Sequence, residues 1–158
     1  RRAFMDAASG IWGTALRNGR PLRVIMLDID NFKAINDEFG HDAGDSVLVN
    51  VARILAQNCR NGDVVSRWGG EEFVMLLPET DLAQACVFAE RIRHEIEQAR
   101  AVLRTQSLRI TISLGAAERE QHASLDALIR DADQWLYHAK RQGRNQVASC
   151  RCCAQISS

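Results

Sequence analysis

Residues 63–77 hold two apolar runs separated by two glycines and two acids. The runs at 63–67 and 72–77 predict the arms of a β-hairpin, because a glycine-containing turn between two such runs is typical of paired strands. Gly69 and Gly70 are expected to supply the positive φ angles of that turn. The hairpin constrains the fold because it fixes two adjacent antiparallel strands and places Glu71 and Glu72 at their tip.

Two neighbouring carboxylates at a hairpin tip repel each other. They are a poor choice for stability, but their hard oxygens suit a divalent cation such as Mg²⁺. On these residues alone, an ordinary solvated turn with two surface acids is an equally open interpretation.

The rest of the chain alternates between helical and strand patterns. The nearly continuous apolar run 22–27 predicts a buried central strand, and further strands are expected at 108–116 and 146–148. Helices are expected at 2–18, 32–38 and 42–57, then one capped by Thr80 and one capped by Ser124 and ended by Gly143 as its C′ residue. This order mixes antiparallel pairs with helical crossovers, so it predicts an α+β domain with helices around one sheet.

Composition excludes several classes of function. The 158 residues fit one domain, and 20 basic residues balance 20 acidic ones, so there is no broad basic surface for DNA or RNA. Few strand aromatics argue against an RNA-binding domain that stacks bases. No apolar stretch reaches the ~20 residues of a membrane span, and no signal peptide is expected. The opening directly into a helix is expected of a fragment of a longer chain.

The cysteines fall into two groups. Cys59 and Cys86 lie in apolar helical patterns and are expected to be small core residues. Cys150, Cys152 and Cys153 crowd a polar end that we expect to be flexible over residues 150–158. No histidine or second ligand pair lies nearby, so free thiols in a reducing cytoplasm are favoured over a zinc site.

Asp28 stands where the central strand runs out of apolar residues. Polar groups at such strand ends commonly face a ligand crevice. If the hairpin tip lies beside that end, Asp28, Glu71 and Glu72 form a carboxylate cluster that a metal would neutralise. Metal ions held between carboxylates and phosphates are the recurring device for attack on a nucleotide phosphate. A strand-end acid in water is the alternative for Asp28.

Four blocks of sequence resemble the GGDEF family of diguanylate cyclases. They lie in the family's order and cover almost the whole chain. The blocks are Leu27-Asp28-Ile29-Asp30-Asn31-Phe32-Lys33; Ile35-Asn36-Asp37 with Phe39-Gly40-His41-Asp42-Ala43-Gly44-Asp45; Arg67-Trp68-Gly69-Gly70-Glu71-Glu72-Phe73; and Ala132-Asp133, Leu136-Tyr137, Ala139-Lys140 and Gly143-Arg144-Asn145.

The resemblance implies a ferredoxin-like sheet of the nucleotide-cyclase, palm-like type. It also implies an enzyme that joins two GTP molecules into cyclic di-GMP and releases pyrophosphate. Such an enzyme uses Mg²⁺ or Mn²⁺, works as a head-to-head homodimer and is inhibited by its product. The alternative is a non-catalytic module that binds cyclic di-GMP or GTP within a larger signalling protein.

The resemblance also implies roles for individual residues. Metal ligands would be Asp28, Glu71 and the Ile29 carbonyl, with Glu71 and Glu72 as catalytic residues. Asn36 and Asp45 would bind guanine. Phosphate would be held by Phe32 and Lys33, at the start of a short helix whose free N–H groups suit anions, and by Lys140 and Arg144.

Ordinary interpretations of two of these residues remain open. Asn36 can simply turn the chain before Gly40, although its amide can also pair with guanine. Lys140 lies in the last turn of a helix, where the dipole favours any cation. Arg144, just beyond the Gly143 cap, favours anion binding for the pair.

A second site is implied before the hairpin. Arg60-Asn61-Gly62-Asp63 resembles the family's Arg-x-x-Asp inhibitory motif, which binds cyclic di-GMP through arginine and aspartate. Arg91 would be a third member, with a solvated helix-face arginine as its alternative.

Two features depart from the family pattern. The family's Asp-x-Leu-Thr-Gly-Leu-x-Asn segment would precede Arg1-Arg2, so residues 1–149 are expected to be an N-terminally truncated GGDEF domain. A sensory or regulatory domain would precede it in a bacterial cytoplasmic protein, or in the cytoplasmic part of a larger or membrane-attached one. Trp135 replaces a small residue and predicts local repacking.

Overall fold

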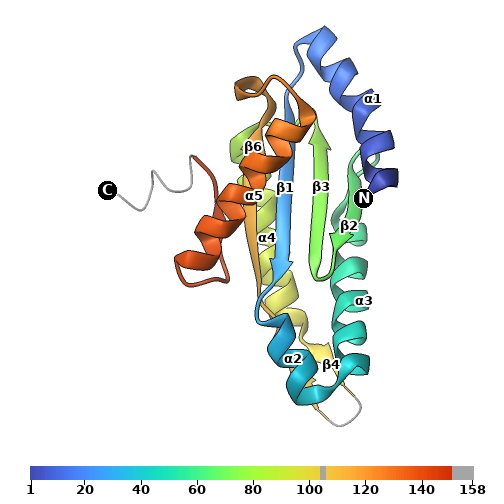
Figure 1. Cartoon of the computed structure of the whole chain (residues 1–158), viewed down its shortest axis with the longest axis vertical. Helices are drawn as coiled ribbons and strands as arrows, with labels where there is room; N and C mark the ends of the chain where they lie inside the picture. Colours follow the sequence, from blue (N-terminus) through green and yellow to red (C-terminus); the bar gives the residue numbers. More distant parts are fainter. Residues whose placement is uncertain (104–105, 151–158) are drawn as a thin grey trace.

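A five-stranded sheet forms the centre of the computed structural model, which describes residues 1–103 and 106–150 (Figure 1). The strand order is β2-β3-β1-β6-β7. The strands are β1 (Leu22–Ile29), β2 (Val64–Gly69), β3 (Glu72–Pro78), β6 (Ile112–Glu118) and β7 (Val147–Ala148). All neighbours are antiparallel except β6 and β7, which are parallel. The predicted mixed sheet is therefore confirmed.

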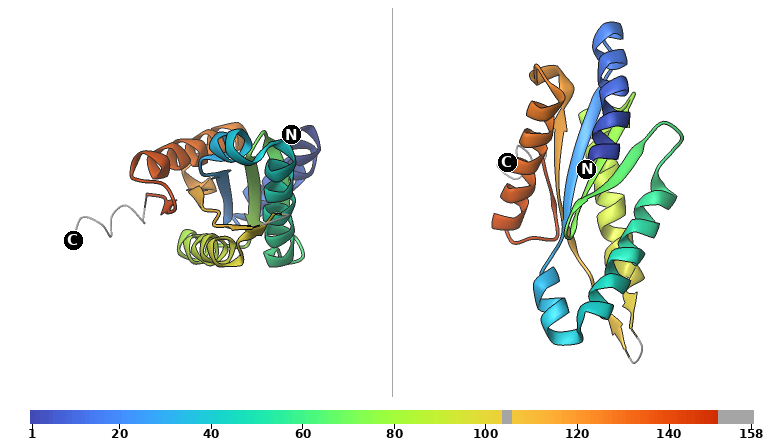
Figure 2. Two further views of the ribbon diagram at one scale, coloured as in Figure 1. Left: turned by 90° about the horizontal axis from the view of Figure 1, so that it is seen from below. Right: turned by 45° about the vertical axis from the view of Figure 1, so that its right-hand side comes forward.

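Helices cover both faces of the sheet (Figure 2). They are α1 (Arg2–Asn18), α2 (Phe32–Phe39), α3 (His41–Asn58), α4 (Leu82–Ala99) and α5 (Leu125–Arg141). Alternate residues of β1 point to opposite faces. Ile25 and Leu27 pack in a core with α3 and α4, whereas Val24 and Met26 pack in a second core with α1 and α5. A strand buried on both faces explains the continuous apolar run.

The path β1–α3–β2–β3–α4–β6, with the order β2-β3-β1-β6, is the ferredoxin-like split βαβ arrangement. It places β1 between β3 and β6. The end of β1 is therefore flanked by the hairpin tip on one side and by the start of β6 on the other. The predicted α+β class is confirmed.

The strand predicted at 108–116 was misplaced. It is observed at Ile112–Glu118, because β1 ends at Ile29 and offers no partner to residues before Ile112. Ser107–Leu108 (β5) instead pairs with Ala101–Val102 (β4) in a small separate hairpin that was not predicted.

Two local predictions were wrong. Gly70 has a φ of 50°, but Gly69 lies in β2 without a positive φ, because a bulge between Arg67 and Gly69 supplies the extra twist. Asp81, not Thr80, caps α4, because its side chain and that of Gln84 form a reciprocal capping box. The Thr80 hydroxyl donates to the Pro78 carbonyl instead (2.9 Å).

The predicted ends of α5 are confirmed. Ser124 Oγ accepts a hydrogen bond from the Ala127 N–H (3.1 Å). At the other end the N–H groups of Gly143 and Arg144 bond to the carbonyls of Lys140 and Ala139, so Gly143 is the C′ residue of a Schellman motif. This motif turns the chain sharply after Lys140 and directs residues 144–146 back towards the sheet.

Three further predictions concern a membrane span, the C-terminal tail and two of the cysteines. Within the described ranges, none of the helices combines the length and apolar character needed to cross a bilayer. The flexible tail predicted from Cys150 includes Cys152 and Cys153, which lie outside the described residues. Cys59 and Cys86 pack partly buried against the core of α3 and α4, as predicted.

Gly115 allows α5 to lie directly on β6. A Cβ at this position would stand 2.1 Å from the Leu136 nitrogen and 2.2 Å from the Ala132 oxygen. Both contacts are backbone atoms of α5, so the helix would have to move away from the sheet and take Lys140 with it.

We therefore expect Gly115→Ala to lower the free energy of unfolding by about 3 kcal/mol, through overpacking against a rigid helix. Gly10→Ala is the matched control: a Cβ added there would meet nothing within 4 Å, so it should stabilise α1 by about 0.5–1 kcal/mol. Urea unfolding of both variants measures the effect. Equal stability of the Gly115 variant and its parent would contradict the close approach.

Candidate active site

The hairpin tip lies beside the end of β1, as the sequence predicted. Asp28 is paired with Glu72 of β3 on one side and with Ser113 of β6 on the other. The next residue, Ile29, donates its N–H to the Glu71 carbonyl (3.3 Å). Asp28, Ile29, Glu71 and Glu72 therefore meet at one edge of the sheet, although they come from two separate sequence segments.

Lys140 joins this group from the last turn of α5. Its Nζ donates to Asp28 Oδ2 at 2.9 Å, and the Asp28 side chain is only 9% exposed. The close approach of α5 to β6 at Gly115 allows the end of the helix to lie here. A strand-end acid in water is thus the wrong description of Asp28, which is buried and paired.

Burial raises the pKa of the Asp28 carboxyl and outweighs the hydrogen bond and the charge of Lys140, which act in the opposite direction. Repulsion from Glu71 and Asp30 adds to the rise. The pKa of Glu72 is also raised, first by burial and then by Asp28 and Asp133. Burial and like charges thus both disfavour the ionised carboxyls at this edge, and a further positive charge nearby would offset that effect.

The carboxylates do not form a ready-made metal cage. Across residues 1–103 and 106–150, no three His, Cys, Asp or Glu side chains converge as a metal site. Asp28 Oδ2 is directed to Lys140, and the metal-ligand roles of Asp28, Glu71 and the Ile29 carbonyl stay predictions. The donors still fit Mg²⁺, which usually binds one or two carboxylates and takes its other oxygens from phosphates and water.

Arg67 braces the turn that carries the acids. Its Nε donates to the Gly70 carbonyl at 2.7 Å. Trp68 packs edge-to-face on Phe4 of α1, with ring centroids 5.8 Å apart. Two side chains of β2 therefore hold the hairpin tip, Arg67 across the turn and Trp68 against α1, and fix the turn that carries Glu71.

The two residues predicted to bind guanine lie on consecutive helices, Asn36 on α2 and Asp45 on α3. Asn36 of α2 lies so close to Gly44 of α3 that a Cβ there would come within 1.8 Å of Asn36 Oδ1. Asp45, the next residue, is exposed. An amide and a carboxylate from these two helices offer the donor and acceptor types that the guanine edge requires.

The residues predicted to bind phosphate lie on two elements. Phe32 and Lys33 open α2 just after β1 ends. Arg144 is exposed and has a positive φ of 64° beyond the Schellman turn. Lys140, which the structure pairs with Asp28, is one turn of α5 before it.

Asp30 is a site residue that sequence reasoning did not single out. It is 4% exposed and accepts hydrogen bonds from Thr111 Oγ1 (2.8 Å), Ser113 Oγ (2.6 Å) and the Asn145 N–H (3.0 Å). Its place in Asp28-Ile29-Asp30 was a usable signal, because residues two apart on a strand point to the same face.

Asn145 links this edge to α4. Its side chain accepts from Arg93 Nη1 (2.8 Å) and donates to Glu97 Oε2 (2.9 Å). Arg109 also donates to Glu97, at 2.5 Å. Hydrogen bonds from Arg109 and Asn145 lower the pKa of the Glu97 carboxyl to about 2.

The three residues of the predicted inhibitory site line one cavity of about 250 Å³. Its lining comprises Asn58, Arg60, Asp63, Leu77, Thr80, Gln84, Phe88 and Arg91. Asp63 accepts hydrogen bonds from the Arg60 N–H (3.0 Å) and Nε (3.3 Å). Arg60 Nη2 also donates to Thr80 Oγ1 (2.5 Å) and to the Pro78 carbonyl. Arg91 lies over the Phe88 ring, 5.2 Å from its centroid.

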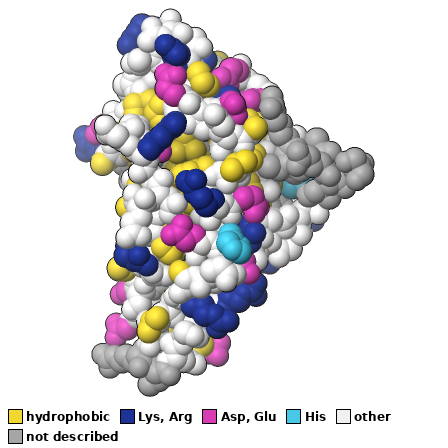
Figure 3. All heavy atoms as spheres, turned by 180° about the vertical axis from the view of Figure 1, so that it is seen from behind, with side chains coloured by type: hydrophobic (Ala, Val, Ile, Leu, Met, Phe, Trp, Pro, Cys, Tyr) yellow, Lys and Arg dark blue, Asp and Glu magenta, His cyan; other side chains and the backbone are white. Residues whose placement is uncertain are grey.

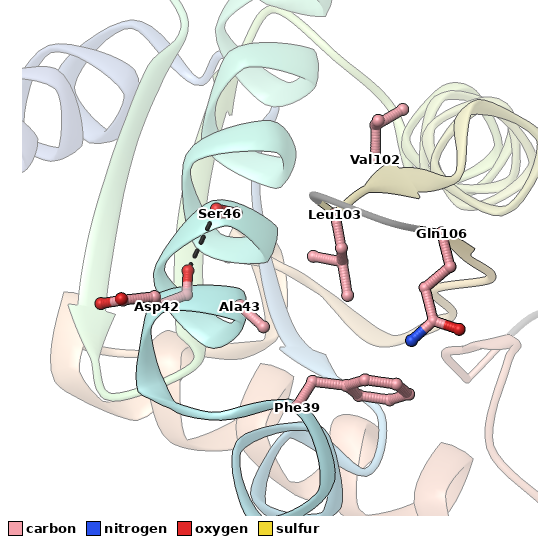
Figure 4. Close-up of a pocket in the computed structure, with 7 residues that line it drawn as sticks. All are labelled: Phe39, Asp42, Ala43, Ser46, Val102, Leu103 and Gln106. Atoms are coloured by element: carbon pink, nitrogen blue, oxygen red, sulfur yellow. Dashed lines mark hydrogen bonds between the residues drawn. The ribbon is translucent and has the colours of Figure 1, made fainter.

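Another cavity, of about 610 Å³, contains none of the predicted site residues. It lies between the α2–α3 corner and the β4–β5 hairpin, where Phe39 and Gln106 point into it and the Asp42 carboxylate points away (Figure 4). Basic side chains are scattered among acidic and hydrophobic ones on the face shown in Figure 3. The described residues that line this cavity include no Lys or Arg, and the face in Figure 3 shows no continuous basic stripe of the kind that binds nucleic acid.

The chain matches the sequence model of one family, described as "Diguanylate cyclase, GGDEF domain", over residues 1–146. The chain belongs to the diguanylate cyclase GGDEF-domain family. Within this GGDEF domain the characteristic motif is Gly69-Gly70-Glu71-Glu72-Phe73, at the hairpin tip.

Among curated proteins, the GGDEF domain is 40% identical over 134 residues to diguanylate cyclase DosC of Escherichia coli, covering 84% of this chain and 29% of the relative. It is 46% identical over 124 residues to diguanylate cyclase DgcM of the same organism, and this match covers 78% of this chain and 30% of DgcM. It is 40% identical over 157 residues to diguanylate cyclase VdcA of Vibrio cholerae, and this match covers 92% of this chain and 46% of VdcA. The chain thus spans less than half the length of each of these relatives.

Solved structures agree with this assignment. The GGDEF domain of DgcB from Caulobacter crescentus, in complex with c-di-GMP, superposes with a TM-score of 0.90 at 35% identity, covering 94% of this chain and 89% of that one. The active GGEEF domain of a Vibrio cholerae diguanylate cyclase superposes with a TM-score of 0.87 at 34% identity, covering 94% of this chain and 95% of that one. The predicted family and fold are confirmed.

The Glu97 network predicts a pH dependence. A lowered carboxyl pKa stabilises the fold fully above about 4.5, the ordinary value, and this stabilisation disappears as the pH falls towards about 2. We expect the difference in free energy of unfolding between the parent and Glu97→Gln to shrink over that window.

Urea unfolding at stepped pH measures that difference. Glu38→Gln, at an exposed position on α2, is the matched control for removing one helical carboxyl. A difference between the parent and Glu97→Gln that stays constant from pH 5 to pH 2 would contradict the role given to Arg109 and Asn145.

Proposed function

We propose that this GGDEF domain condenses two GTP molecules into cyclic di-GMP with release of pyrophosphate. The observation that carries the proposal is the convergence of Asp28, Glu71, Glu72 and Lys140 at one sheet edge, in a chain 40–46% identical to named diguanylate cyclases. Acids and a cation at one strand end suit a nucleotide triphosphate and its metal ion.

The metal ion in this proposal is Mg²⁺ or Mn²⁺. Asp28, Glu71 and the Ile29 carbonyl would hold it, and when bound it would neutralise charge on the reacting phosphates. The raised pKa of Asp28, which comes first from burial, supports a site where added positive charge is favoured. The Lys140 ammonium, which donates to Asp28 Oδ2 in this structure, would instead contact the terminal phosphates of bound GTP.

The nucleotide would lie across the edge. Asn36 and Asp45 would read the guanine, and the N–H groups of Phe32 and Lys33 would contact the phosphates at the start of α2. Lys140 and Arg144 would hold the β and γ phosphates. The Lys140 ammonium would act as a compact positive charge, and the planar Arg144 guanidinium could donate two parallel hydrogen bonds. The contact of Asn36 with Gly44, the residue before Asp45, supports the first of these assignments.

The reaction needs two copies of the domain. One such site holds one GTP, so the 3′-hydroxyl of each GTP must attack the α-phosphorus held by the other copy. Each step forms an O3′–P bond, breaks the bond from the α-phosphorus to the bridging oxygen and releases pyrophosphate. Glu71 would take the hydroxyl proton, and Glu72 would act beside the phosphates.

Product inhibition is the second part of the proposal. Arg60, Asp63 and Arg91 line one cavity and match the chemistry of a guanine nucleotide: two guanidinium groups for phosphate or base stacking, and a carboxylate for the guanine edge. Binding of cyclic di-GMP there would restrain the domain. The cavity is distinct from the edge that holds Asp28, because no residue of that edge lines it.

The setting of the domain is also a proposal. The curated relatives are at least twice as long as this chain, which supports a sensory or regulatory domain elsewhere in the protein. GTP as substrate supports a location in the bacterial cytoplasm, in a cytoplasmic protein or in the cytoplasmic part of a membrane-attached one.

A non-catalytic module that binds cyclic di-GMP or GTP is the second candidate. The Arg60–Asp63 cavity favours it, since this cavity alone would suffice for a receptor. Incubation of the chain with GTP and Mg²⁺ separates the two candidates. Cyclic di-GMP is expected in the reaction mixture, and its absence at protein concentrations high enough for pairing would favour the receptor.

We predict that Glu71→Gln lowers turnover on the order of 100-fold or more, because it removes a metal ligand and a base, while GTP binding stays measurable through the guanine contacts. Product chromatography and calorimetry measure the two effects. Glu79→Gln, at the other end of β3 in an exposed ion pair with Arg20, is the control and should retain activity. Full turnover in the Glu71 variant would refute the assignment.

Arg60→Ala should raise the cyclic di-GMP concentration for half-maximal inhibition about tenfold or more, because a hydrogen bond to a charged group contributes about 1.5–3 kcal/mol. Arg53→Ala, which removes an arginine whose hydrogen bonds within the described ranges all stay inside α3, is the control. Calorimetry with cyclic di-GMP gives the same comparison without turnover. Unchanged binding in the Arg60 variant would exclude this cavity as the inhibitory site.

A further inference from the structure

Asp30 is a buried and fully hydrogen-bonded carboxylate beside the proposed active site. One oxygen accepts from Ser113 Oγ (2.6 Å), and the other accepts from Thr111 Oγ1 (2.8 Å) and the Asn145 N–H (3.0 Å). With 4% exposure, it has little access to solvent or to a ligand. Its oxygens are committed to neighbours from elements far away in sequence.

The contact with residue 145 holds a strained backbone. Arg144 and Asn145 have positive φ angles of 64° and 47°, a conformation that residues other than glycine rarely adopt twice in succession. Surrounding contacts must hold such a conformation in place. The bond from the Asn145 N–H to Asp30 does so from the residue after β1, and the Asn145 side chain does so from α4 through Arg93 and Glu97.

Asp28 and Asp30 hold the two ends of the same short segment. They lie two residues apart, so their side chains leave β1 on the same side. Asp28 binds the Lys140 ammonium, and Asp30 binds the backbone five residues further on. Between these two attachments lie the Schellman turn and the exposed residue Arg144, whose direction is therefore set by the backbone that Asp30 holds.

We propose that Asp30 is a positioning residue for triphosphate recognition: by fixing the Asn145 backbone against the end of β1 it orients Lys140 and Arg144 towards the β and γ phosphates of GTP. It contacts neither the nucleotide nor the metal ion. This inference rests on the proposed function, since it assigns these two cations to the phosphates. It makes Asp30 a determinant of the preference for GTP over GMP.

The test measures the affinities of two nucleotides in the presence of Mg²⁺. One is a GTP analogue with a methylene group between the α and β phosphorus, which cannot release pyrophosphate, and the other is GMP. Asp30→Ala should lower the ratio of analogue to GMP affinity about tenfold, while GMP affinity, set by Asn36 and Asp45, stays within about twofold.

Two variants separate positioning from general stability. Asp30→Asn keeps an oxygen for the Asn145 N–H, and its amide can donate to the Ser113 hydroxyl, so it should restore the parental ratio. The double variant Thr111→Val, Ser113→Ala removes both hydroxyl donors and keeps the bond to Asn145, so it should lower stability but preserve the ratio. If Asp30→Ala does not fold, Asp30→Ser, which is too short to span both partners, takes its place.

The outcomes distinguish the inference from the function on which it rests. A parent chain that binds the analogue no better than GMP overturns the phosphate assignment and the inference with it. If the parent binds the analogue better than GMP and Asp30→Ala shows the same affinity ratio, only the inference about Asp30 is overturned. Equal loss of both affinities in Asp30→Ala also overturns it, since that result indicates only a damaged fold.

Discussion

The pairing of Asp28 with Glu72 across β1 and β3 is the constraint on which the site depends. The ladder places two acids side by side at the edge of a buried sheet, and the two-residue turn adds Glu71 beside them. Burial raises the pKa of both Asp28 and Glu72, so the arrangement is costly as it stands. Such a cost is typical of functional sites, because a cation and a polyanionic ligand can relieve it together.

Packing far from the acids determines which cation reaches them. Gly115 lets α5 lie against β6, so the end of that helix brings Lys140 to Asp28, and the Schellman turn at Gly143 then directs the following residues back towards the sheet. The buried carboxylate of Asp30 ties the segment after that turn to the same strand. The second cavity, around Arg60 and Asp63, lies at the opposite end of the hairpin strands, so one hairpin contributes to both the sheet edge and this cavity.

Local patterns predicted what depends on neighbouring residues. The apolar stripes located the five main helices, and Ser124 and Gly143 marked the ends of α5, because caps and periodicity act within one or two turns. Contacts between distant segments could not be read in the same way. The sequence around Asp30 did not indicate its hydrogen bond to Asn145. Thr80 was predicted to cap a helix, but its hydroxyl accepts a hydrogen bond from Arg60. The start of β6 depends on its pairing with β1.

A crystal structure of this chain with Mg²⁺ and the methylene GTP analogue would test the central claim most directly. The account predicts guanine between Asn36 and Asp45, the α-phosphate beside Asp28 and Glu71, and the terminal phosphates at Lys140 and Arg144. Nucleotide bound only in the cavity of Arg60, Asp63 and Arg91, with Lys140 still on Asp28, would contradict it.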